Sequence, residues 1–326
     1  DLYNSFKSNR EIISRRLPNI ENPGLHPSDP EYVEGYGPSQ NNVNVAAFIA
    51  AYTNKSAFDI ELDQKKEFSK SNYIPRPNWQ LNYNGLSRLK MFKDIFSNIT
   101  IKHGYSSTIR VSRFETQPNY NSLDPFVELS PNNNYYSQIE IPTVSIQEQF
   151  VPVIGISVKT VKDMKIDFEY KTTRNLELGI SQLRENKGKE IIIGGGYVIK
   201  NFKAFSKKKK SVKKKKKKDG EPEDDSPEPD DKAKRTTVAK GRDLRFNLSY
   251  SLRDDLSQVY DLLTGISAQA DRGSKTVTLN PTIEYDVNKN LSLRFYFDYS
   301  KITPKTSLNF PVTTIRSGLT LRFNIN

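Results

Sequence analysis

The two histidines of this sequence are its only side chains that ordinarily change charge near neutral pH, so they are the first candidates for chemistry. His103 lies in "IKHGYSS", four residues before Ser107, and His26 lies in a loop that is rich in proline. Nucleophilic hydrolysis needs a serine beside an oriented base, and His103 with Ser107 is the only such arrangement worth testing. Because no recognisable nucleophile motif surrounds this pair, we expect a protein that is not an enzyme.

Other kinds of reactive site are excluded or weakly supported by composition. The chain has no cysteine, which excludes disulfides, thiolate metal sites and a cysteine nucleophile. Two histidines cannot make a multi-histidine metal site. The "GGG" at 194–196 is not a phosphate-binding loop, because no Gly-Lys-Ser/Thr follows it. We therefore expect no metal and no cofactor.

The strongest charge feature is "KKKKSVKKKKKKDGEPEDDSPEPDD", residues 207–231. Its lysines and acids nearly cancel, so it explains little of the net charge of +12. Charged, Pro- and Gly-containing sequence of this kind is typical of a solvated, disordered tether. The alternative is that its lysines dock on an acidic partner or on nucleic acid.

The elements that must position these residues are strands, because most segments from residue 78 onward alternate apolar and polar residues. Successive side chains of a strand point to opposite faces, so each segment has one apolar and one polar face. The residues that we expect on the apolar face include Phe246, Leu279, Ile283, Leu291, Leu293, Phe295 and Phe297. The predicted strands span roughly 78–86, 99–113, 138–160, 163–185, 189–202, 241–253, 274–287, 290–301 and 313–326.

Such alternation suits either a soluble β-sandwich or a transmembrane β-barrel whose apolar face meets lipid. The strands are long, short turns alternate with longer loops at 254–273 and 302–312, and 17 Tyr and 17 Phe can supply interfacial aromatics. No apolar stretch is long enough for a transmembrane helix. A mean hydropathy of −0.69 still fits a barrel, because the face that lines the lumen is polar. We therefore predict an all-β fold, a segment of a transmembrane antiparallel β-barrel.

The predicted organisation has four parts. Residues 1–77 form an irregular segment, with a short helix near 43–54 packed on or in the barrel; "EIISRRL" fits either a strand end or a helix. Residues 78–202 and 241–326 supply barrel strands, and 203–240 form the Lys-rich loop. The strand from Met164 keeps its phase to Ile180 and should project beyond the membrane.

The chain ends in "IRSGLTLRFNIN", in which Arg316, Gly318, Leu321 and Phe323 fit the C-terminal insertion signal of bacterial outer-membrane barrels. Several longer stretches resemble one family in order: "NVAAFIAAYTNK", "IPRPNWQLNYNGLSRL", "ITIKHGYSSTIRVSRF", "TRNLELGISQLRE", "GGGYVIKNF" and "FPVTTIRSGLTLRFN". The chain resembles the C-terminal part of the SprA (Sov) family, the outer-membrane translocon of the type IX secretion system of Bacteroidota. The chain starts at Asp1 without a signal peptide, so we expect a processed chain or a fragment.

The resemblance implies a protein-conducting channel in the outer membrane that passes folded cargo, including gliding adhesins, to the cell surface. It also implies several partners: the remaining N-terminal strands of the translocon, a PorV-like shuttle barrel, a plug protein, secreted cargo and outer-membrane lipids. The alternative is a smaller outer-membrane barrel with ligand-binding or phospholipase-type activity, which would use His103 and Ser107.

Topology decides where the lysine run should lie. The resemblance to outer-membrane barrels puts the C-terminus in the periplasm. Counting strands backwards then puts the loop 203–240 and the short turns near 161–164 and 287–290 on the periplasmic side. Nucleic acid is not a partner there, which leaves a tether or an acidic periplasmic partner. An odd number of strands also leaves two open edges, which must pair with strands from elsewhere, because unpaired backbone is costly in lipid.

Overall fold

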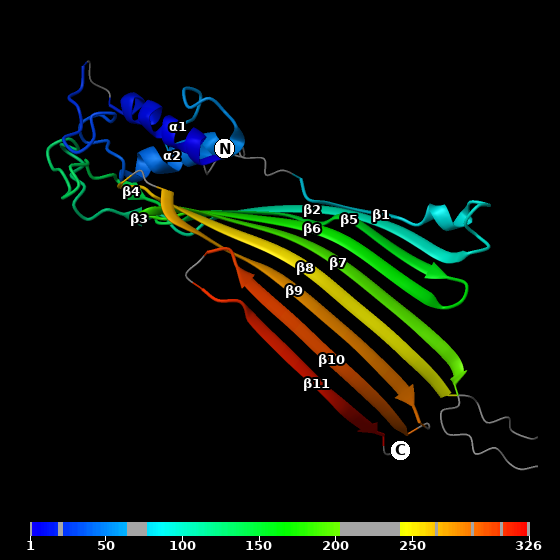
Figure 1. The fold of residues 1–326 in the computed structure, drawn as a ribbon. Coiled ribbons are helices and arrows are strands. Elements are labelled where there is room, and N and C mark those ends of the chain that lie inside the picture. Colours follow the sequence, from blue (N-terminus) through cyan, green and yellow to red (C-terminus); the bar gives the residue numbers. More distant parts are fainter. Residues whose placement is uncertain are drawn as a thin grey trace, which may run out of the picture.

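The computed structural model describes residues 2–18, 22–63, 77–202, 242–264, 267–287, 290–306 and 309–324. Its main element is one nine-stranded antiparallel sheet in which neighbouring strands follow one another along the chain (Figure 1). The strands are β1 (Trp79–Tyr83), β2 (Phe96–Val111), β5 (Val144–Thr160), β6 (Met164–Leu178), β7 (Gln182–Phe202), β8 (Arg242–Asp261), β9 (Ser267–Asp286), β10 (Leu291–Pro304) and β11 (Val312–Phe323). The prediction of an all-β fold built on one antiparallel sheet is confirmed.

The strands β1 and β11 are the two edges of this sheet. A short 3-10 helix, Gly85–Arg88, follows β1. The connection from β2 to β5 contains a separate two-stranded sheet of β3 (Glu115–Thr116) and β4 (Ile139–Glu140). Within the described residues no ladder joins β1 to β11, so the sheet is open.

The register places the predicted apolar residues on one face of the sheet, here called the apolar face. Phe246 of β8 pairs with Ile283 of β9, Ile283 pairs with Phe295 of β10, and Phe295 pairs with Leu319 of β11. Directly paired residues lie on the same side of a sheet, so the apolar positions of successive strands form continuous rows. The intervening residues, such as Asn247, Ser249 and Thr282, lie on the opposite face, here called the polar face.

Two helices, α1 (Leu2–Arg16) and α2 (Asn41–Thr53), lie together at one end of the strands (Figure 1). With residues 22–40 and 54–63 they form a unit that we call the helical cap. α1 buries Tyr3, Phe6, Arg10 and Ile13, whose spacing of three and four places them on one side of a helix. At α2, the side chain of Gln40 accepts a hydrogen bond from the Asn42 backbone N–H at 2.6 Å.

The helical cap packs on the apolar face of the sheet. Its buried side chains share one core with strand residues of that face: Val144, Ile146, Leu176, Leu178, Leu183 and Tyr260. Arg10, which is 1 % exposed, donates from Nη2 to the carbonyl oxygen of Leu262 at 2.7 Å. The rings of Tyr3 and Tyr260 stack with centroids 5.8 Å apart.

Several predicted boundaries are wrong. The first helix is regular over fifteen residues, so 1–77 is less irregular than predicted, and "EIISRRL" is helical. The predicted loop 254–273 is mostly strand. After their apolar alternation has ended, β8 and β9 stay paired as far as Tyr260 and Ser267, with a register shift after Ser257. The predicted segment 138–160 holds two strands, β4 and β5, and β6 ends at Leu178, so Ile180 lies in a turn.

Candidate functional site

The apolar face carries an extensive exposed apolar surface beyond the helical cap. Leu248 is 49 % exposed in the middle of the sheet, and Leu319 and Phe323 are each 63 % exposed on β11. Other exposed members of this surface are Met164, Ile166, Ile193, Tyr197, Phe246, Ile283, Phe295, Ile315 and Leu321. The predicted residues Leu279, Leu291, Leu293 and Phe297 lie on the same face and are half-buried. Contiguous exposed apolar surface of this kind marks a membrane or protein interaction site.

The height of this surface can be worked out from the strands. On β8 the apolar positions run from Leu244 to Leu252, and on β9 they run from Val277 to Tyr285. Eight residue steps give about 26 Å along a strand, or about 20 Å across a membrane for strands that tilt by about 40°. The lipid-facing band of outer-membrane barrels is about 25 Å tall. We call these rows the apolar band.

A network of charges around two buried carboxylates lies between the apolar band and the helical cap. Arg174 donates from Nε to Oε1 of Glu185 at 2.7 Å, and Nζ of Lys187 lies 3.0 Å from Oε2 of the same carboxylate. Nη1 of Arg174 also lies 3.7 Å from Oε2 of Glu148. Glu185 is only 1 % exposed, and a carboxylate buried this deeply needs cationic partners such as these two. The network therefore fixes β5, β6 and β7 to one another at the level where the apolar rows end.

Two tyrosines connect this network to the helical cap and to β2. Tyr52 of α2 and Tyr105 of β2 each donate a hydroxyl hydrogen bond to Oε1 of Glu148 at 3.0 Å. Burial raises the pKa of Tyr52 to about 12; a hydrogen bond with Ser107 lowers this pKa, and the carboxylate of Glu148 raises it. The tyrosine is therefore a neutral donor at physiological pH, and its hydrogen bond joins the cap to the sheet.

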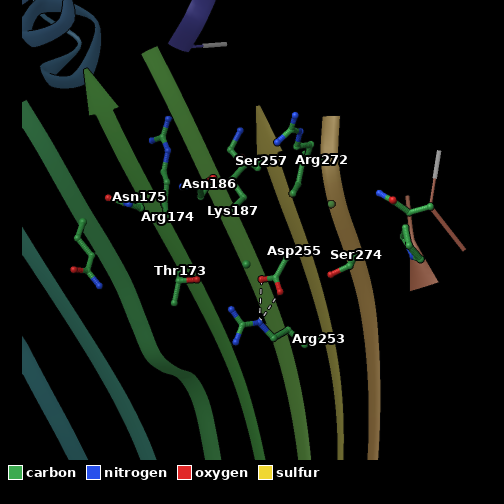
Figure 2. A pocket seen from close by; sticks show the side chains of 16 residues that line it. Thr173, Arg174, Asn175, Asn186, Lys187, Arg253, Asp255, Ser257, Arg272 and Ser274 are labelled. Atoms are coloured by element: carbon green, nitrogen blue, oxygen red, sulfur yellow. Dashed lines mark hydrogen bonds and ion pairs between the residues drawn. The ribbon is translucent and has the colours of Figure 1, made fainter. Parts of the chain in front are cut away.

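The polar face is hydrophilic and is hollowed at the level of the charge network. An open groove of 670 Å³ lies on the polar face, lined there by Thr173, Arg253, Asp255 and Ser274 and by further residues of β5 to β10 (Figure 2). Nε of Arg253 lies 2.7 Å from Oδ2 of Asp255. Small-molecule sites are mostly apolar and enclosed, whereas this groove is open and most of the residues that line it are polar or charged.

The C-terminal residues lie on the edge strand β11, divided between the two faces. Leu321 and Phe323 belong to the apolar face, and Arg316 and Gly318 to the polar face. Gly318 pairs with Tyr296, and a Cβ at Gly318 would lie 2.6 Å from the Tyr296 hydroxyl. The tyrosine ring thus lies over the glycine, an arrangement that stabilises glycine in a strand. Nη2 of Arg316 lies 4.0 Å from Oδ2 of Asp298.

The candidate catalytic pair is not assembled. His103 lies on the predicted apolar face, where its Nδ1–H donates to the carbonyl oxygen of Val153 at 2.6 Å. Ser107 is buried four residues further along the same strand, which separates the two by about 13 Å in an extended chain. His26 is also buried, and its ring packs against Gly37. Among the described residues, no group of acidic or histidine side chains could hold a metal ion.

The glycines 194–196 lie inside β7, paired with β6 and β8 on either side, so they do not form a loop.

The Lys-rich segment lies outside the described residues. Its flanking strands end at Phe202 and begin at Arg242, at the end of the sheet opposite the helical cap. The turn between β5 and β6 at 161–163 lies at that same end (Figure 1), and so do the last residue of β9, Asp286, and the first residue of β10, Leu291, in agreement with the strand count.

The charge network was missed by the sequence analysis. One signal was present, because Glu148, Arg174 and Glu185 occupy positions in phase with apolar residues of their strands.

Comparison with known proteins does not assign the chain to a family. No family model matches the chain. No curated protein matches it either. None of the helices in the described parts of the chain is long and apolar enough to cross a membrane.

Proposed function

We propose that this chain supplies the C-terminal strands of a large β-barrel in the outer membrane of a Gram-negative bacterium. The barrel is the protein-conducting channel of a type IX secretion system, and it passes folded cargo, including gliding adhesins, to the cell surface. The chain has no enzymatic role in this proposal. The single observation that carries the membrane assignment is the exposed apolar band, which faces away from a hydrophilic surface on the same strands.

The choice between a sandwich and a membrane sheet follows from the same band. A sandwich covers the apolar face of each sheet with a second sheet. Here only the end beneath the helical cap is covered within the described residues, while Leu248 and Leu319 stay exposed. A band about 20 Å tall across tilted strands suits hydrocarbon, and lipid would cover it.

The open edges support a larger assembly. Unpaired backbone groups at an edge cost several kcal/mol each in hydrocarbon, so β1 and β11 need partners. The remaining N-terminal strands of the translocon would supply them and close the barrel. The polar face would then line a wide, wet lumen, which suits the passage of folded proteins better than the binding of a small ligand.

The family resemblance of the sequence is the basis for four parts of this proposal: secretion, the shuttle barrel, the plug protein and the assignment to Bacteroidota. In this orientation the end with the turns near 161–164 and 287–290 is periplasmic. The helical cap is then outside the cell.

Adjacent residues of β8 give a direct test. A photo-crosslinking amino acid at Asn247, on the polar face, should capture a stalled cargo protein in cells, whereas the same probe at Leu248 should capture lipid. The full-length chain should be recovered with the outer membrane. Recovery in the soluble fraction, or cargo captured equally at both positions, would refute the proposal. An image of the extracted particle with a barrel closed by only these strands would refute the larger assembly.

A further inference from the structure

The apolar band ends abruptly in a row of charged and hydroxyl side chains. The last apolar row crosses Ile191, Leu252 and Val277. Two residues further toward the helical cap, about 7 Å along the strands, the paired positions are Lys189, Asp254 and Lys275. Thr172 and Thr303 extend this row on β6 and β10. Lys301, which pairs with Val277, reaches the same level from β10.

Cations outnumber carboxylates on this part of the apolar face. The cations are Arg174, Lys187, Lys189, Lys275, Lys301 and Lys305, and the carboxylates are Glu148, Glu185 and Asp254. Arg174 and Lys187 share Glu185, and Lys305 pairs with Asp254. Within the described residues no ion pair neutralises Lys189, Lys275 or Lys301, and all three are exposed. The edge of the apolar band therefore carries a net positive charge, although Asp254 lies between Lys189 and Lys275 in the row.

The position of these lysines limits what they can meet. They lie on the same face as the apolar band and directly next to it, so they do not face the polar groove. Beyond them on β5 to β8, the same face is covered by the helical cap. A molecule whose apolar part covers Leu252 and Val277 would place its polar end against these lysines.

We propose that Lys189, Lys275 and Lys301 bind the phosphate groups of phosphorylated glycolipid headgroups in the outer leaflet. This inference rests on the proposed function for the membrane and for its orientation. Lysine side chains extend from the edge of an apolar region to reach headgroups. Clusters of basic residues near a bilayer bind anionic headgroups, and the hydroxyls of Thr172 and Thr303 lie in the same row as further donors.

The test compares three sets of substitutions in the full-length protein extracted from the outer membrane. The first variant replaces Lys189, Lys275 and Lys301 with Gln and spares the charge network. The matched control removes three cations from the polar face of neighbouring strands, with Gln at Lys171, Arg184 and Arg272. A third variant, Lys275→Gln with Lys301→Gln, removes two of the three lysines and should fold normally.

Lipid A that is retained per protein is counted by mass spectrometry. Binding in lipid nanodiscs is then measured for lipid A, for dephosphorylated lipid A and for inorganic phosphate alone. A basic residue near an anionic surface contributes about fivefold to binding. The three-lysine variant should therefore bind lipid A at least about tenfold more weakly, the double variant should show a smaller loss, and the control should match the wild type.

Equal retention of lipid A by the wild type and by both lysine variants would overturn the inference while leaving the proposed function intact. Equal loss in the polar-face control, or binding of dephosphorylated lipid A as tight as that of lipid A, would also overturn it. Wild-type binding of inorganic phosphate as tight as that of lipid A would assign the site to free phosphate instead. Absence of the wild type from the outer-membrane fraction would refute the proposed function, and the inference would fail with it.

Discussion

Placing an arginine in the centre of the apolar band should prevent stable assembly of the sheet in the membrane. Leu248 lies midway between Leu244 and Leu252 on β8 and is 49 % exposed. An arginine at the bilayer midplane costs a transmembrane barrel about 2–4 kcal/mol. This cost corresponds to a loss of about thirtyfold to several hundredfold in the ratio of folded to unfolded protein.

The matched control is Ser249→Arg, the next residue on the same strand. Ser249 lies on the polar face between Gly194 and Asn280, so an arginine there stays in water. Phe323→Asp adds a depth test, because Phe323 lies at the end of its strand, where a charge near the interface costs about 0–1 kcal/mol. The expected order of damage is Leu248→Arg, then Phe323→Asp, then Ser249→Arg.

The assay measures how much full-length protein in the outer-membrane fraction resists protease and urea extraction. A soluble protein would place Leu248 in water, and its replacement by arginine would then be harmless or would improve solubility. Wild-type levels of the assembled Leu248→Arg protein would therefore contradict the assignment of this face to lipid. Equal damage from Ser249→Arg would contradict the division of the sheet into two faces.

Three further predictions follow from other parts of the chain. Gly318→Glu should lower the amount of assembled protein several-fold, because a Cβ added at this position meets the ring of Tyr296. Adding Tyr296→Ser should restore part of the assembled protein, and no rescue would count against the ring contact. Replacing 205–239 with a short Gly/Ser turn should leave assembly intact. A cysteine at Ser211 should react with an impermeant thiol reagent only after the outer membrane is opened. Labelling in intact cells would show that the proposed orientation is the wrong way round. The raised pKa of Tyr52 means that its stabilising effect is complete below about pH 10 and is lost as pH rises towards 12; protease protection of the cap should fall over that window, and Tyr52→Phe should reduce this fall.

The sequence was most informative where the structure repeats locally. Alternation has a period of two residues. Leu291, Leu293, Phe295 and Phe297 on one strand, and Phe246 on another, could therefore each be assigned to the apolar side of their strand without knowledge of the fold. The same signal failed at 254–273. Alternation marks a strand that has one face buried or in lipid, whereas β8 and β9 continue beyond the apolar band.

Two other features were beyond reach for a different reason. α1 buries only a narrow stripe, and Arg10 belongs to it, so hydropathy alone does not mark the stripe as a core surface. The partners of Arg10 and of Glu185 lie on other elements of the sheet. Contacts between distant segments leave no periodic trace in one sequence, so the charge network could not be assembled from it.

The attachment of the helical cap has a consequence for the order in which the protein folds. Arg10 is held by the carbonyl oxygen of Leu262, 252 residues later in the chain. The α1 helix therefore lacks this anchor until β8 has been made and has joined β7. Contacts between residues so far apart in the chain form slowly, because a long loop must close first. Docking of the helices should be among the last folding events, and an exposed α1 would identify chains whose strands have not yet assembled.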